Sequence, residues 1–109
     1  MGILNGPSNG VAGGGNISTQ VSTSVNTPGL ANPRTNYTYI CTAVLTFTLP
    51  TAIGNTGVYT IKNTSAGIVT LSTTSAQTID GSAPGTIAAG GCLEVFSNNS
   101  NWLIQSKYL

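Results

Sequence analysis

The stretch that decides the fold is residues 58–81, VYTIKNTSAGIVTLSTTSAQTIDG. Its runs 58–62 and 69–72 alternate apolar and polar side chains with the period of two that is typical of half-buried strands. A short polar loop ending in Gly67 separates them, and glycine allows the positive φ at which a hairpin closes through a bulge. The pattern predicts that the two runs pair as one β-hairpin and that Asp80-Gly81 forms the next turn.

Short segments of strand character, separated by turn residues, continue along the rest of the chain. Strands are predicted at 37–41, 45–49, 86–87, 92–96 and 102–104, and the last two are expected to form a second hairpin through the turn at 97–101. With no helical pattern between them, they predict an all-β fold, a small antiparallel β-sandwich or jelly-roll-like barrel with an extended N-terminal arm. The predicted core is Leu45, Phe47, Leu49, Ile61, Val69, Leu71, Ile79, Leu93, Val95, Trp102 and Ile104.

Residues 1–35 differ in composition from residues 36–109, which we expect to form the β-sandwich domain. The first segment is rich in Gly, Ser, Thr and Asn with scattered aliphatic side chains, a composition typical of an arm or linker. Such a segment is stabilised by lying on another surface, so we expect an extended assembly arm; the alternative is a floppy tail. The apolar residues that would anchor the arm are Ile3, Leu4, Val11, Ile17, Val21 and Val25.

The scarcity of charge indicates a protein that associates closely with copies of itself. Charged residues make up 5% of the chain and the net charge is +1, against roughly 25% charged residues in ordinary soluble proteins. The edge strands of soluble monomers are usually guarded by Lys, Pro or inward charge, yet Lys62 and Lys107 are the only lysines. We therefore expect a homo-oligomer whose copies cover each other's edges, with a trimer as the expected size.

The reactive residues are too few to predict catalysis, a cofactor or a metal site. The chain has no His, and its carboxylates are Asp80, in a turn, and Glu94, in a strand. These two could form a glycosidase pair, but the sequence much more strongly favours Asp80 as a turn former and Glu94 as an exposed strand residue. A zinc site would need about four Cys or His ligands, and only Cys41 and Cys92 are available. We predict no enzyme and buried free thiols, with a disulfide as the alternative.

Nucleic acid and membrane are not expected partners. The basic residues Arg34, Lys62 and Lys107 are scattered along the chain rather than clustered. The apolar runs are far shorter than the roughly 18 residues of a membrane span, and no secretory signal is expected. The aromatic residues Tyr37, Tyr39, Tyr59 and Trp102 could stack on sugars. We expect instead that Trp102 lies in the core and that the tyrosines line the sheet faces.

A series of short motifs between about residues 45 and 104 resembles a small β-module of virion proteins of tailed bacteriophages. In order, the motifs are TLP (48–50), GNTG (54–57), YTIKN (59–63), Gly67, VTL (69–71), QTIDG (77–81) and NW (101–102). Their order is more specific than any one of them. The resemblance implies an oligomeric, often trimeric, β-fold on the outside of a virus particle, as on tail fibres, tailspikes, head fibres and capsid decoration proteins.

Two functions fit this resemblance. Because only a short arm, with no shaft, repeat or coiled coil, precedes the module, we expect a capsid decoration (cement) protein. It would bind the major capsid protein on the exterior of the virion through its arm and stabilise the shell. The alternative is a tail-fibre or head-fibre tip that recognises host-surface glycans through loops 51–57 and 98–101.

Overall fold

The computed structural model describes residues 15–109 of the chain, and within that range it contains strands, turns and bends but no helix. This confirms the all-β prediction. The short alternating segments of the sequence become strands because alternation places one set of side chains inside and the other in water. The strands are β2 (Ile17–Thr23), β3 (Thr27–Pro28), β4 (Thr35–Cys41), β5 (Thr46–Thr48), β6 (Val58–Asn63), β7 (Val69–Ser72), β8 (Thr86–Ile87), β9 (Cys92–Ser97) and β10 (Trp102–Tyr108).

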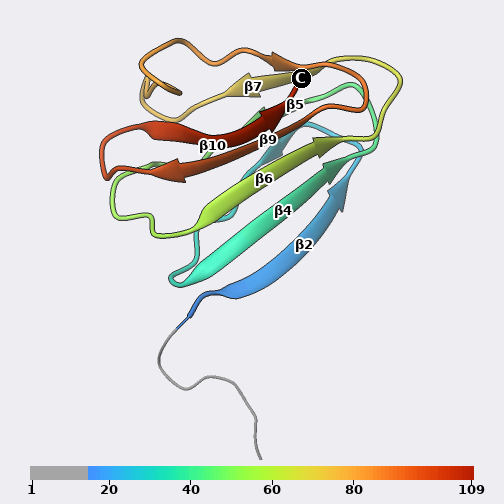
Figure 1. Cartoon of the computed structure of the whole chain (residues 1–109). Coiled ribbons are helices and arrows are strands. Elements are labelled where there is room, and N and C mark those ends of the chain that lie inside the picture. The colour runs from blue at the N-terminus through green and yellow to red at the C-terminus, as the bar shows by residue number, and fades with distance from the viewer. Residues whose placement is uncertain (1–14) are drawn as a thin grey trace, which may run out of the picture.

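Within residues 15–109 the strands form two sheets, one of five strands in the order β10-β9-β6-β4-β2 and one of four in the order β3-β5-β7-β8. Figure 1 shows the long strands of the first sheet lying side by side, with β2 at its outer edge. Within the expected arm, β2 and β3 are extended and hydrogen-bonded to the sheets, with a bend at residues 24–25 between them.

The strands β2 to β7 alternate between the two sheets and stack in parallel. In the first sheet β2, β4 and β6 are parallel neighbours, and in the second β3, β5 and β7 are parallel neighbours. Each pair of consecutive strands is thus one turn of a short solenoid, the arrangement of a β-helix. The prediction of an antiparallel sandwich or closed barrel was wrong in this respect, since the sheets are mixed and, in the described range, remain open.

The predicted hairpin of residues 58–72 is also wrong, because β6 and β7 belong to different sheets. The loop between them turns a corner around Asn63, which is fully buried. The Asn63 Oδ1 accepts hydrogen bonds from the Ser65 N–H at 2.9 Å and hydroxyl at 2.7 Å, and its Nδ2 donates to the carbonyls of Gly67 and Ile87 at 2.8 and 2.9 Å. These bonds direct the chain into the second sheet instead of back along β6.

The C-terminal strands β8, β9 and β10 pair antiparallel with their neighbours. β8 pairs with β7, and β9 pairs with β6 and with β10, which confirms the predicted hairpin through residues 97–101. The predicted turn at Asp80-Gly81 is also confirmed: φ is 51° at Asp80 and 76° at Gly81, as in the type I′ turn that Asp-Gly favours.

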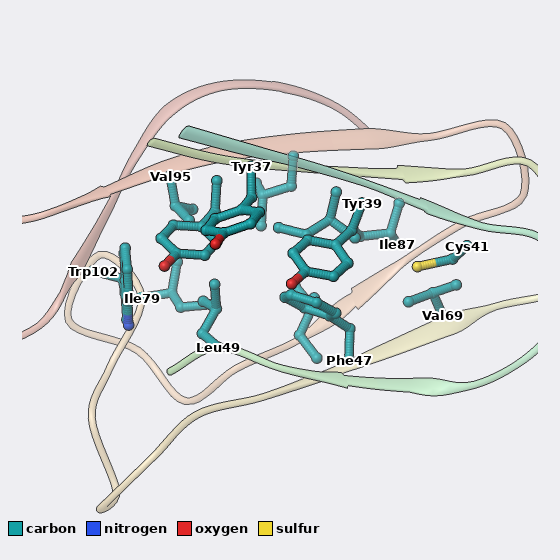
Figure 2. Packing of buried hydrophobic residues seen from close by; sticks show 14 of the residues in the cluster. Tyr37, Tyr39, Cys41, Phe47, Leu49, Val69, Ile79, Ile87, Val95 and Trp102 are labelled. Atoms are coloured by element: carbon teal, nitrogen blue, oxygen red, sulfur yellow. The ribbon is translucent and has the colours of Figure 1, made fainter. Parts of the chain in front are cut away.

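The core lies between the two sheets (Figure 2). Ten of the eleven predicted core residues are buried, and Ile104 is partly buried against the same cluster. Tyr39 of one sheet packs on Phe47 of the other with ring centroids 4.6 Å apart, and Tyr59 meets Trp102 edge-on at 5.2 Å. The core also includes residues absent from the predicted set: Tyr37, Tyr39, Ala52, Tyr59 and Ile87.

Candidate functional site

The residues predicted to anchor an assembly arm fall into two groups. Ile3, Leu4 and Val11 lie outside the described residues, whereas Ile17 and Val21 belong to β2 and Val25 follows it. The Ile17 side chain is 68% exposed and that of Val25 is 66% exposed, while Val21 is partly buried against the core. The described anchor residues therefore lie in or directly after β2, at the edge of the protein's own five-stranded sheet.

The β2 strand has one edge without a described neighbour. Ile17 N–H donates to the Arg34 carbonyl and the Thr23 carbonyl accepts from Thr42 N–H, both at 2.8 Å. These bonds place the backbone groups of the odd-numbered residues toward β4, because successive residues of a strand point their N–H and C=O to opposite sides. The groups of the even-numbered residues face the open edge: Ser18, Gln20 and Ser22.

The opposite edge of the same sheet, at β10, is covered by the chain itself. Trp102 N–H donates to the Thr78 carbonyl and its own carbonyl accepts from Asp80 N–H, both at 2.9 Å. The carboxylate of Asp80 then accepts the N–H of Ile104 at 2.8 Å. Farther along β10, the pairing with β9 shifts register between Ile104 and Ser106, and a bulge of this kind discourages addition of another strand.

The edges of the four-stranded sheet are short. β3 consists of two residues, one of which is Pro28, and β8 also consists of two. Short edges and proline both oppose strand addition. Within residues 15–109, β2 is thus the one long sheet edge that carries neither a covering segment nor a proline, a lysine or a bulge.

A cavity of about 440 Å³ lies among the loops at one end of the sheets. It combines apolar side chains with hydroxyl, amide and guanidinium groups, and Ile53 at its rim is 63% exposed. Because it carries both apolar and hydrogen-bonding surface, it has the character of a site for a small polar molecule. Its lining residues are Ala31, Asn32, Pro33, Arg34, Thr51, Ile53, Gly54, Asn55 and Thr56.

The two loops that the sequence analysis selected for glycan recognition are neighbours. Gly54 N–H of loop 51–57 donates to the Asn99 Oδ1 of loop 98–101 at 2.7 Å, and the Ser97 hydroxyl donates to the Ala52 carbonyl. Only the first of these loops lines the cavity. The aromatic residues considered for sugar stacking are buried in the core instead: Tyr37, Tyr39, Tyr59 and Trp102.

The carboxylates accept hydrogen bonds from the backbone and from polar side chains, and the thiols are free. Asp80 is in its turn, and Glu94 accepts hydrogen bonds from Thr60 at 3.3 Å and from neighbours on β10. Both cysteines are free, so the alternative of a disulfide is not realised; Cys41 is buried, and Cys92 is only partly buried, contrary to the prediction. Among the described residues, no group of three or more His, Cys, Asp or Glu could hold a metal ion.

Comparisons of the chain with protein-family models, curated proteins and solved structures found no match. No helix within residues 15–109 has the length and apolar character needed to cross a membrane. Within residues 15–109, the β2 edge and the loop cavity are the surfaces that offer groups to a partner or a ligand.

Proposed function

We propose that this chain is a structural protein of a bacteriophage virion, a capsid decoration protein that binds the exterior of the shell and stabilises it as a homo-oligomer. The observation that carries the association is the β2 edge, which is seven residues long, uncharged and, among residues 15–109, without a neighbouring strand. A surface of this kind gains hydrogen bonds and apolar contact when another chain covers it. The order of motifs between residues 45 and 104 supports the viral setting.

The mechanism is additive binding rather than chemistry. Of the expected arm, residues 1–14 supply the contact with the major capsid protein, and the strands that begin at β2 form the sheets through which copies associate on the shell. A protein that binds the assembled shell but not its dissociated subunits shifts the equilibrium toward the assembled state by mass action. The many Ser, Thr and Asn side chains and the net charge of +1 keep electrostatic repulsion between neighbouring copies small.

Binding to shells that lack the protein tests this function. Purified full-length chain is mixed with such shells, the shells are sedimented, and the bound protein and the temperature of shell disruption are measured. We expect saturation at a copy number proportional to the number of coat subunits and a higher disruption temperature. A full-length protein that stays in the supernatant would overturn the proposal.

A truncation separates the arm from the folded sheets. Deletion of residues 1–14 removes none of the contacts that the structure describes, and the unfolding midpoint of the variant is measured beside that of the full chain. We expect the variant to lose most of its binding to shells. If it decorates shells as well as the full chain does, the first 14 residues are not the attachment segment.

The second candidate function is a glycan-binding tip, which the loop cavity of about 440 Å³ favours. Ile53 offers an exposed apolar side chain at its rim, beside hydroxyl and amide groups. On this alternative, a glycan array gives specific binding that Ile53→Ser weakens, and the particle carries only a few copies. Decoration predicts no glycan binding and many copies.

A further inference from the structure

We infer that β2 of one copy pairs antiparallel with β2 of a second copy around a two-fold axis at Gln20, so that two five-stranded sheets become one. The inference rests on the part of the proposed function in which copies associate, and it does not depend on binding to a shell. It assigns the interface to one named strand.

The backbone geometry fixes the register of this pairing. The N–H and C=O groups of β2 that no residue of 15–109 uses belong to even-numbered residues, so Gln20 lies opposite Gln20 of the second copy, and Ser18 lies opposite its Ser22. Each of these residues then exchanges both of its backbone hydrogen bonds with the residue opposite it. No backbone group of the β2 edge is left without a partner between Ser18 and Ser22.

The antiparallel direction also places the side chains correctly. A two-fold axis perpendicular to the sheet keeps the inner faces of both copies on the same side. Ile17, which is 68% exposed, then lies opposite Thr23 of the second copy, and Val21 lies opposite its Thr19. The core-facing side of the sheet continues across the interface. The Ile17 side chain, which is exposed to water in the single copy, then packs against the second copy.

The charge of β2 favours a second copy as its occupant. The strand reads ISTQVST, without a charged residue, so two identical edges meet without like charges facing each other. A partner of opposite charge has nothing to recognise on this edge. The amide of Gln20 and the hydroxyls of Ser18 and Ser22 can donate and accept, so they are complementary to themselves.

The treatment of the other long edge strengthens the assignment. At β10 the chain satisfies the edge with its own residues, through Thr78 and the carboxylate of Asp80. In the part of the chain that the structure describes, the same five-stranded sheet therefore has one edge closed to strand addition and one edge open to it. One open edge gives a two-fold pair, which replaces the trimer expected from the sequence, because a ring of three would need two different edges on each copy.

Charge reversal at the two-fold axis tests the pairing. Gln20→Lys and Gln20→Glu each place two like charges opposite one another across the axis, whereas a one-to-one mixture of the variants places opposite charges there. The mass in solution is measured by analytical ultracentrifugation over a dilution series. We expect a dimer for the unaltered chain, a dimer dissociation constant raised roughly five-fold or more for each variant, and recovery of dimer in the mixture.

Two further variants make the test specific. Gln20→Pro removes an N–H that no described residue of the same copy accepts, so we expect the fold to be retained and the dimer to be lost. Thr70→Lys adds the same charge to the exposed face of β7, in the middle of the other sheet, and should leave the dimer unchanged. Unfolding midpoints of all variants report whether the single copy remains folded.

Several outcomes would overturn the inference. A monomer at all concentrations, a trimer, or a dimer that tolerates both charges at Gln20 would each show that β2 does not pair with itself. A dimer that appears only after deletion of residues 1–14 would show that the chain's own N-terminal segment covers the edge. A monomeric chain that still saturates shells would refute the β2 pairing and leave binding to the capsid intact.

Discussion

The Tyr59 hydroxyl donates a hydrogen bond of 2.6 Å to the backbone carbonyl of Leu30. The N–H of Leu30 donates a hydrogen bond to the Tyr39 hydroxyl at 2.8 Å. Leu30 is thus held by its backbone, while its side chain is 53% exposed. Two tyrosines from the core therefore hold the connection between β3 and β4 in place by hydrogen bonds to its backbone.

Replacement of Tyr59 by phenylalanine should destabilise the protein by about 1–3 kcal/mol. The ring keeps its place in the core, but the Leu30 carbonyl loses its donor, and the Asn55 Nδ2, which donates to Tyr59 at 3.0 Å, loses its acceptor. Denaturant unfolding measures the change. Tyr108→Phe is the control, since that side chain is 75% exposed and should change stability little; equal effects of the two substitutions would contradict the role given to Tyr59.

Stability should fall as the pH rises above about 10. Burial raises the pKa values of Tyr39 and Tyr59 above the ordinary value of 10.0, because the ionised phenolate would lose its hydration, and hydrogen bonds from Leu30 and Asn55 oppose this more weakly. The unfolded chain then releases protons that the folded chain retains. The stability is fully present below the unfolded pKa and is lost as the pH rises through the folded pKa.

Unfolding free energies measured across this alkaline range, together with the ultraviolet absorbance of tyrosinate, test the expectation. Tyr59→Phe should make the dependence on pH shallower. A flat profile for the unaltered chain up to the complete ionisation of its tyrosines would contradict the burial of these hydroxyls.

Asn63→Asp should destabilise the corner between β6 and β7 by about 3 kcal/mol at neutral pH. Its Nδ2 donates to two carbonyls, and a carboxylate there would place a buried negative charge against the same oxygens. The introduced acid will therefore have a raised pKa, and the deficit relative to the unaltered chain should shrink as the pH falls toward the point where the acid is protonated.

Asn98→Asp is the matched control for this corner. The Asn98 Oδ1 accepts hydrogen bonds from the N–H groups of Ser100 and Asn101 at 3.0 and 2.8 Å, and a carboxylate can accept the same bonds at this exposed site. We expect a small change in the unfolding midpoint. If both aspartates cost the same at neutral pH, Asn63 does not hold the corner as described.

The two thiols should differ in reactivity. Cys41 is fully buried, and burial raises the pKa of its thiol, so the reactive thiolate is scarce and inaccessible. Cys92 is partly buried and should react first with a thiol reagent under native conditions. Mass spectrometry should show modification of Cys92 first and of Cys41 only after the protein has had time to unfold. Simultaneous modification of both thiols would contradict this order.

The sequence predicted which segments are strands and which residues are buried better than it predicted how strands pair. Alternation depends on burial, so Leu45, Phe47 and Ile61 could be assigned to the core from local pattern alone. Pairing depends on contacts distant in the sequence, and a polar loop of five residues suits a hairpin and a corner equally well. The difference lies in Asn63, whose contact with Ile87 no local pattern reveals.

The candidate site was predictable in part for the same reason. The scarcity of charge indicated that edges would be unguarded, but it did not show which ones. That Asp80 covers β10 depends on its carboxylate reaching Ile104, and that β2 stays open depends on the order of the sheet. The burial of Tyr37, Tyr39 and Tyr59 was missed because their hydroxyls are satisfied by distant groups such as the Leu30 backbone.

The central claim, that this chain is a structural protein on the exterior of a bacteriophage shell, is tested most directly by an image reconstruction of the intact particle. The account predicts density for these two sheets on the outer surface of the capsid, repeated with the symmetry of the coat and seated on the major capsid protein. Density confined to a fibre or tail tip, or a particle that contains none of this chain, would contradict it.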